Sequence, residues 1–138
     1  MTAAKHTDYS GTPLPKKLGI VAATPRPCEV ALLGAPEGFR DGLGELPLAT
    51  FTSRIRATAN LALVFVRKAD ELDAAVDLLA AQLPQGASAW IVHPKQQCKP
   101  DFNQNHVRAA ALARGLVDYK VCSVDDAWSG LKFAHRKR

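Results

Sequence analysis

Residues 30–39, VALLGAPEGF, join an apolar run to two glycines and a proline, a composition typical of the junction between a buried strand and a helix. In α/β proteins a glycine-rich junction of this kind can hold the phosphate of a nucleotide. Glycine lets the backbone approach the ligand closely, and the following helix supplies free N–H groups. Gly34 and Gly38 occupy the outer glycine positions of such a pattern. The stretch is therefore the first candidate binding site in the chain.

The polar groups that would accompany a nucleotide or S-adenosylmethionine at this junction are missing. The middle glycine position is Pro36, which has a ring and no N–H to donate. The acidic residue that precedes the first glycine by two positions is replaced by Leu32. The end of the next predicted strand offers Ser53, Arg54 and Arg56 and no carboxylate. These substitutions favour a simple strand-to-helix turn over a cofactor site, and we expect no cofactor.

A second candidate is an anion site formed by the loops 34–38, 67–70 and 93–99. Ligands of open α/β sheets bind outside the carboxyl ends of the strands. The loops there contribute five basic or titratable residues: Arg67, Lys68, His93, Lys95 and Lys99. Asp70 is expected to cap the helix that begins near it, and the positive end of that helix would face the same edge. The cluster predicts binding of a phosphate or carboxylate group, with ordinary solvated loop residues as the alternative.

Cys98 lies between Lys95 and Lys99, and nearby cations favour the thiolate form of a cysteine. It is the candidate reactive thiol, with an ordinary surface thiol as the alternative. The spacing of His93, Cys98 and His106 matches no zinc pattern, so no metal site is predicted. No G-x-S-x-G sequence occurs and no catalytic set of carboxylates or of serine, histidine and aspartate is evident. The sequence therefore assigns no catalytic residue and leans against an enzyme.

The hydrophobic pattern predicts the elements that position these residues. Strands are expected at 28–34, 48–55, 61–66, 87–94, 116–124 and 128–136, and helices at 13–20, after Pro36, at 69–83 and at 103–115. Strands that alternate with helices indicate a mostly parallel sheet with helices on both faces, and the last two strands read as an antiparallel hairpin. We expect one domain over 1–138, with an N-terminal arm at 1–12 and a Rossmann-like core at 28–136.

A parallel sheet that ends in an antiparallel strand resembles the class I methyltransferase fold. The resemblance implies a three-layer sandwich whose sheet begins at 28–33 and changes its direction of growth at 61–66. The stretch between the second and third strands is too short for a full set of elements. The fold is therefore expected to be a trimmed version with one β/α unit missing.

Three segments carry a more specific resemblance: YSGTPLPKKLGI (9–20), AWIVHPK (89–95) and DAWSGLKFAHRK (126–137). They are similar to segments of domain-of-unknown-function family 3052, a small bacterial family. The resemblance implies a bacterial cytosolic protein and supplies no activity and no catalytic residue. We further expect Tyr9 or Trp128, each part of an aromatic-Ser-Gly stretch, to anchor its segment against the rest of the protein.

The net charge of +5 is carried by the two ends of the chain. Residues 1–27 contribute +3, residues 132–138 contribute +4, and residues 28–131 contribute −2. The terminal HRKR could contact nucleic acid, but no nucleic-acid motif accompanies it, and a solvated tail is favoured. The first 17 residues lack the apolar region of a signal peptide, and three irregularly spaced cysteines do not form a disulfide framework. A cytoplasmic location is expected.

The sequence thus favours a non-catalytic, methyltransferase-like module that binds a protein partner or a small anion. The alternative is a divergent enzyme, which would be an S-adenosylmethionine-dependent methyltransferase or a thiol-dependent enzyme that uses Cys98. Membrane association is not predicted, nucleic acid is not the favoured partner, and an oligomer remains open.

Overall fold

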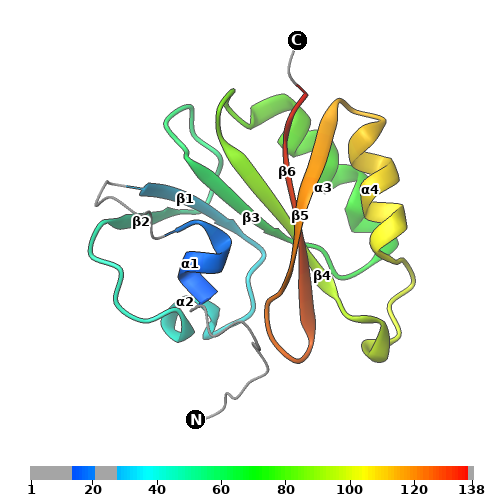
Figure 1. Ribbon diagram of the computed structural model, residues 1–138, viewed down its shortest axis with the longest axis horizontal. Helices are drawn as coiled ribbons and strands as arrows, with labels where there is room; N and C mark the ends of the chain where they lie inside the picture. Colours follow the sequence, from blue (N-terminus) through cyan, green and yellow to red (C-terminus); the bar gives the residue numbers. More distant parts are fainter. Residues whose placement is uncertain (1–13, 21–27, 137–138) are drawn as a thin grey trace.

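The protein is described here by a computed structural model covering residues 14–20 and 28–136 (Figure 1). Its elements are α1 (Leu14–Leu18), β1 (Cys28–Leu33), α2 (Phe39–Gly42), β2 (Ala49–Thr52), β3 (Leu61–Phe65), α3 (Ala69–Gln82), β4 (Ser88–Pro94), the 3₁₀ turn η1 (Gln96–Cys98), α4 (Gln104–Leu112), β5 (Leu116–Ser123) and β6 (Trp128–His135). Each strand and helix expected from the sequence is present, with ends that differ by a few residues. The expected arm at 1–12 and the anchoring of Tyr9 lie outside the described residues.

The six strands form one sheet in the order β2-β1-β3-β4-β6-β5. The first four in the chain run parallel, and β6 is antiparallel to both β4 and β5. The sheet starts at β1, grows toward β2, and then continues from β3 on the other side of β1, as expected. These pairings confirm the mostly parallel sheet that ends in an antiparallel hairpin. The chain passes from β2 to β3 without an intervening helix, as expected for the trimmed fold.

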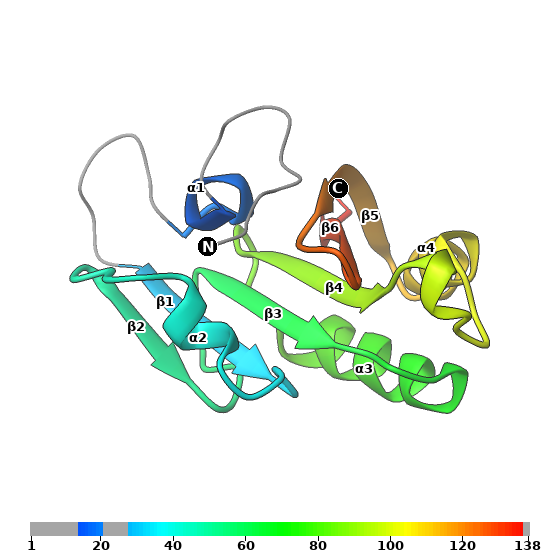
Figure 2. The same ribbon diagram turned by 90° about the horizontal axis from the view of Figure 1, so that it is seen from below.

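Helices cover both faces of the sheet, as the burial of β3 on both of its faces shows. All five of its residues are buried, and they alternate between two apolar clusters. Ala62 and Val64 pack in the cluster that includes α3 and α4, whereas Leu63 and Phe65 pack in the cluster that includes α1 and α2. Figure 2 shows α1 and α3 on opposite sides of the sheet. A continuous apolar strand is the pattern that a doubly covered strand requires.

Trp90 on β4 holds α1 against the sheet. Its side chain is fully buried, and its indole Nε1 donates a hydrogen bond of 2.8 Å to the carbonyl of Leu18 in α1. Gly130 of β6 lies beside the same ring, and a Cβ built on Gly130 would come within 3.0 Å of the Trp90 Cε3 atom. The glycine of the WSG stretch is therefore required because any side chain there would collide with a buried indole.

Trp128, the first residue of the same stretch, packs against β3. Its ring meets Phe65 edge-to-face, with centroids 5.2 Å apart, and Phe65 meets Phe39 of α2 in the same way at 4.9 Å. Aromatic pairs in this arrangement contribute beyond the apolar area that they bury. The expectation that Trp128 anchors its segment is confirmed, and the contact ties the hairpin to the carboxyl end of β3.

Candidate functional site

The glycine turn after β1 brings two strands close together at the carboxyl edge of the sheet. Gly34 has a φ of +73°, in the left-handed region that favours glycine. A Cβ built on it would lie 3.3 Å from the carbonyl oxygen of Phe65 and 3.6 Å from a guanidinium nitrogen of Arg67. Gly38 also has a positive φ, +85°, but nothing lies within 4 Å of its built Cβ. Gly34 is therefore needed for a close approach, and Gly38 only for the turn.

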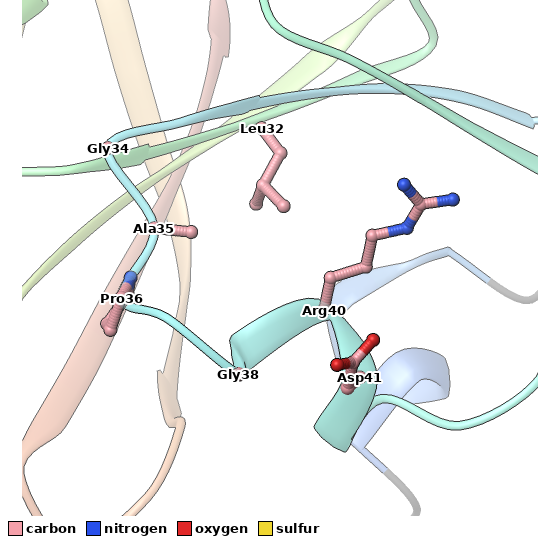
Figure 3. A pocket seen from close by; sticks show the side chains of 7 residues that line it. All are labelled: Leu32, Gly34, Ala35, Pro36, Gly38, Arg40 and Asp41. Carbon is pink, nitrogen blue, oxygen red and sulfur yellow. The ribbon is translucent and has the colours of Figure 1, made fainter.

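An open pocket of about 390 Å³ lies between this turn and α2 (Figure 3). It is lined by Leu32, Gly34, Ala35, Pro36, Gly38, Arg40 and Asp41. In Figure 3 the side chains of Leu32 and Ala35 point into the space between β1 and α2. The pocket thus has an apolar floor where a cofactor-binding version of the turn would present an acidic side chain.

Two lining residues, Arg40 and Asp41, were not singled out by the sequence analysis. Both lie on α2, where Arg40 stacks over the ring of Phe51 with its guanidinium carbon 4.6 Å from the ring centroid. The sequence feature that could have identified Arg40 and Asp41 is their position directly after Gly38 and Phe39, on the helix that follows the turn. Asp41 supplies a carboxylate from α2, whereas the end of β2 carries the exposed residues Ser53 and Arg54.

The Arg67 side chain lies beside the glycine turn. Its guanidinium carbon is 5.3 Å from the centroid of the Trp128 ring, and one of its nitrogens is the atom near the built Cβ of Gly34. A guanidinium over a tryptophan ring is held by a cation–π contact. No carboxylate of a described residue lies within ion-pair distance of it. The structure thus brings Arg67 and Gly34 together, on the face of the sheet that carries α1 and α2.

Two carboxylates accept hydrogen bonds from backbone N–H groups at the start of α3. The N-cap residue is Lys68, and Asp70 makes no cap. The backbone N–H of Ala69 donates instead to Asp101 Oδ1 at 2.8 Å, and the N–H of Arg67 donates to Glu71 Oε1 at 2.8 Å. The expectation that Asp70 caps this helix is wrong, because a carboxylate from the loop before α4 reaches the helix end first. The positive end of α3 therefore adds nothing to the candidate anion site.

His93 lies apart from the other predicted site residues. It is 4% exposed and packs against Phe102, on the face covered by α3 and α4 rather than the face of Arg67. Its Nδ1 lies 3.2 Å from the carbonyl of Pro94, and its Nε2 is buried without a hydrogen-bond partner in the described part of the chain. Burial lowers the pKa of His93, and the hydrogen bond to Pro94 opposes this only in part. The neutral ring brings no positive charge to the carboxyl edge.

Lys95 and Cys98 fasten the tip of the β5–β6 hairpin. Lys95 Nζ donates to Ser123 Oγ at 2.7 Å, and the backbone N–H of Lys95 donates to the carbonyl of Ala127 at 2.8 Å. Cys98 is exposed, and its Sγ lies 3.8 Å from the same carbonyl. Lys95 is therefore directed toward the hairpin, and the candidate thiol Cys98 has a structural contact of its own.

The other sites considered from the sequence are more dispersed. Lys68 and Lys99 are exposed, and Lys99 has a positive φ of 53° at the end of η1. The three cysteines are free, and burial raises the pKa of Cys28.

Across residues 14–20 and 28–136, no three histidine, cysteine or acidic side chains are placed to hold a metal ion. None of the helices described is long and apolar enough to cross a membrane.

Comparison with solved structures identifies the fold. The chain matches a TehB-like SAM-dependent methyltransferase from Corynebacterium glutamicum with a TM-score of 0.54 and 12% identity, over 82% of this chain and 83% of that chain. It matches the ribosomal protein L11 methylase from Lactobacillus delbrueckii subsp. bulgaricus with a TM-score of 0.51 and 11% identity, over 83% of this chain and 73% of the methylase.

A third match is LepI in complex with SAH and a substrate analogue. The TM-score is 0.54 and the identity 13%, over 98% of this chain but only 50% of LepI, so the chain spans half the length of that protein. At these identities the likeness concerns the fold, and the chain has the Rossmann-like fold of class I methyltransferases. No protein-family model and no curated protein matches the chain, so the resemblance to family 3052 is not confirmed.

Proposed function

We propose that this protein is a methyltransferase-fold module that binds a small anion, a phosphate or carboxylate group, at the carboxyl edge between β1 and β3, and that it transfers no methyl group. The observation that carries the proposal is the position of Arg67. Its guanidinium is held over Trp128, lies beside the side-chain-free turn at Gly34, and has no carboxylate partner among the described residues. A pre-positioned guanidinium loses little freedom when it binds an anion, and it can donate two parallel hydrogen bonds.

The same arrangement argues against S-adenosylmethionine in the usual place. Its sulfonium and ammonium groups are cations that the Arg67 guanidinium would repel, which leaves the cofactor's carboxylate as the one group that Arg67 could pair with. Pro36 removes one backbone N–H from the turn, and Leu32 fills the position of the acidic residue. A cytoplasmic location is part of the proposal and is supported by the three free cysteines.

Replacing Arg67 by methionine tests the anion site. Calorimetric titration of the parent protein with inorganic phosphate is expected to show saturable binding. The Arg67→Met variant is expected to bind phosphate about tenfold more weakly or worse, because a hydrogen-bonded charge pair contributes ~1.5–3 kcal/mol. Arg136→Met is the matched control, since Arg136 is an exposed arginine that follows β6 at the opposite end of the sheet.

The control variant is expected to bind phosphate like the parent. Equal losses in the two variants would mean that the phosphate responds to charge in general and that Arg67 makes no site. Unchanged binding in Arg67→Met would place any phosphate elsewhere. Thermal unfolding of both variants, followed by circular dichroism, checks that the fold is intact.

A further inference from the structure

Two lysines lie directly opposite each other on the β5–β6 hairpin. Lys120 and Lys132 are partners in the strand register, so their side chains leave the same face of the sheet. That face is the one that carries α1, because Lys132 lies over the ring of Trp90. Like charges in directly opposed positions destabilise an antiparallel pair. No carboxylate of the described residues lies within ion-pair distance of either ammonium group, so the cost is not offset within that part of the chain.

The ammonium group of Lys132 is fixed in position. Its Nζ lies 5.5 Å from the centroid of the Trp90 ring and 5.7 Å from that of Tyr119. A Cβ built on Gly19, which follows α1, would come within 3.1 Å of the same atom. Two cation–π contacts, and a glycine that leaves room for the ammonium group of this half-buried residue, hold the charge at one place on this face of the sheet.

Tyr119 completes this surface with an exposed aromatic ring. The register between β5 and β6 shifts between Asp118 and Lys120, so Tyr119 is the additional residue of a β-bulge. A bulge changes the direction in which a side chain leaves the strand. Here the Tyr119 side chain extends from β5 past β6, and its hydroxyl forms a hydrogen bond of 2.8 Å with Ser88 Oγ of β4. The residue nevertheless remains 56% exposed. The bulge thus places a ring, fixed at its hydroxyl end, next to two positive charges.

We propose that Tyr119, Lys120 and Lys132 form a binding surface for single-stranded nucleic acid. The Tyr119 ring stacks on a base, and the two ammonium groups neutralise neighbouring phosphates, a combination that single-strand binding uses widely. An acidic protein segment would pair with the lysines but would not use an exposed ring held at a fixed angle. The net charge of +5 adds long-range attraction for a polyanion. Lys132 is itself one of the four basic residues that give residues 132–138 their charge of +4.

This surface is separate from the proposed anion site. Ser88, which holds Tyr119, is the register partner of Leu61 at the start of β3, whereas Arg67 follows the end of β3. Because β3 and β4 are parallel, the two sites lie toward opposite ends of the sheet. The inference does not depend on the proposed function, and each can fail without the other.

The test uses the full chain and a fluorescein-labelled oligouridylate of about 12 nucleotides, within the usual range of single-strand site sizes, with anisotropy as the readout at low salt. Lys120→Glu is expected to weaken binding about tenfold or more and, at the same time, to raise the melting temperature, because the introduced carboxylate faces Lys132. Tyr119→Ala is expected to weaken binding about tenfold, whereas Tyr119→Phe, which keeps the ring but loses the hydrogen bond to Ser88, is expected to bind more tightly than Tyr119→Ala and more weakly than the parent. Arg54→Glu is the matched control, because it makes the same change of charge at an exposed residue near the opposite edge of the sheet.

Three results would overturn the proposal. If Arg54→Glu weakens binding as much as Lys120→Glu, the oligonucleotide responds only to the overall charge of the chain. If Tyr119→Ala binds like the parent, no base stacks on the ring. If oligoglutamate of similar length binds as tightly as the oligouridylate and responds to the same variants, the surface serves an acidic protein segment instead.

Discussion

Trp90→Ala is expected to lower the free energy of unfolding by about 3–5 kcal/mol, the range for removing a large aromatic side chain from a core. Trp90 is fully buried on β4 and contacts two other elements: α1 through the Leu18 carbonyl, and β6 at Gly130 and at the ammonium group of Lys132. Its loss leaves a cavity and an unpaired carbonyl. Because the stability of a domain of this size is about 5–15 kcal/mol, the expected loss is a large fraction of the total.

Chemical denaturation measures this effect, and Trp90→Phe is the matched variant. Phenylalanine keeps most of the apolar volume but cannot donate to the Leu18 carbonyl, so its loss of stability should lie well below that of alanine. If Trp90→Ala unfolds at the same denaturant concentration as the parent, α1 is not held against the sheet in the way described.

Gly130→Val is expected to cost about 1–3 kcal/mol, the usual penalty of overpacking a well-filled core. The first added carbon would meet the Trp90 ring at 3.0 Å, and that ring is fully buried and bonded to α1, so it has little room to move. The penalty comes from the close approach and not from backbone strain, because the φ of Gly130 is not positive. The melting temperature should therefore fall.

Gly42→Ala is the control for Gly130→Val. Gly42 lies in α2, nothing is within 4 Å of its built Cβ, and its φ is not positive. Alanine stabilises a helix relative to glycine by about 0.5–1 kcal/mol, so this variant should melt at or slightly above the temperature of the parent. A Gly130→Val variant that melts as Gly42→Ala does would mean that β6 does not approach Trp90 closely.

Much of the fold could be predicted because its strongest signals are local. The continuous apolar run at Leu61–Phe65 predicts a strand covered on both faces, and the stripe along Ala69–Gln82 predicts an amphipathic helix. The alternation of these elements then restricts the sheet to few topologies. The helix expected at 103–115 also forms, and Asn103 caps it through a capping box with His106.

The candidate site was predicted less completely, because its contacts join residues that are distant in the sequence. Arg67 was expected among loop cations, but its ring partner, Trp128, belongs to the last strand. Asp101 caps α3 from another loop, where only Asp70 could be considered from local spacing. His93 was expected beside Arg67 because both follow parallel strands, yet its side chain leaves the sheet on the other face. The face of the sheet on which a side chain lies at the end of a strand depends on where the strand ends, and the hydrophobic pattern of the sequence does not determine that residue.

Calorimetric titration tests the central claim most directly, with S-adenosylmethionine and its demethylated product as the two ligands. The claim is that the turn at Gly34, with Pro36 in the middle position and the Arg67 guanidinium beside it, does not bind this cofactor. We predict no saturable heat of binding with either compound. Saturable binding with micromolar affinity that is lost in the Gly34→Trp variant would contradict the account, because it would place the cofactor in the turn itself.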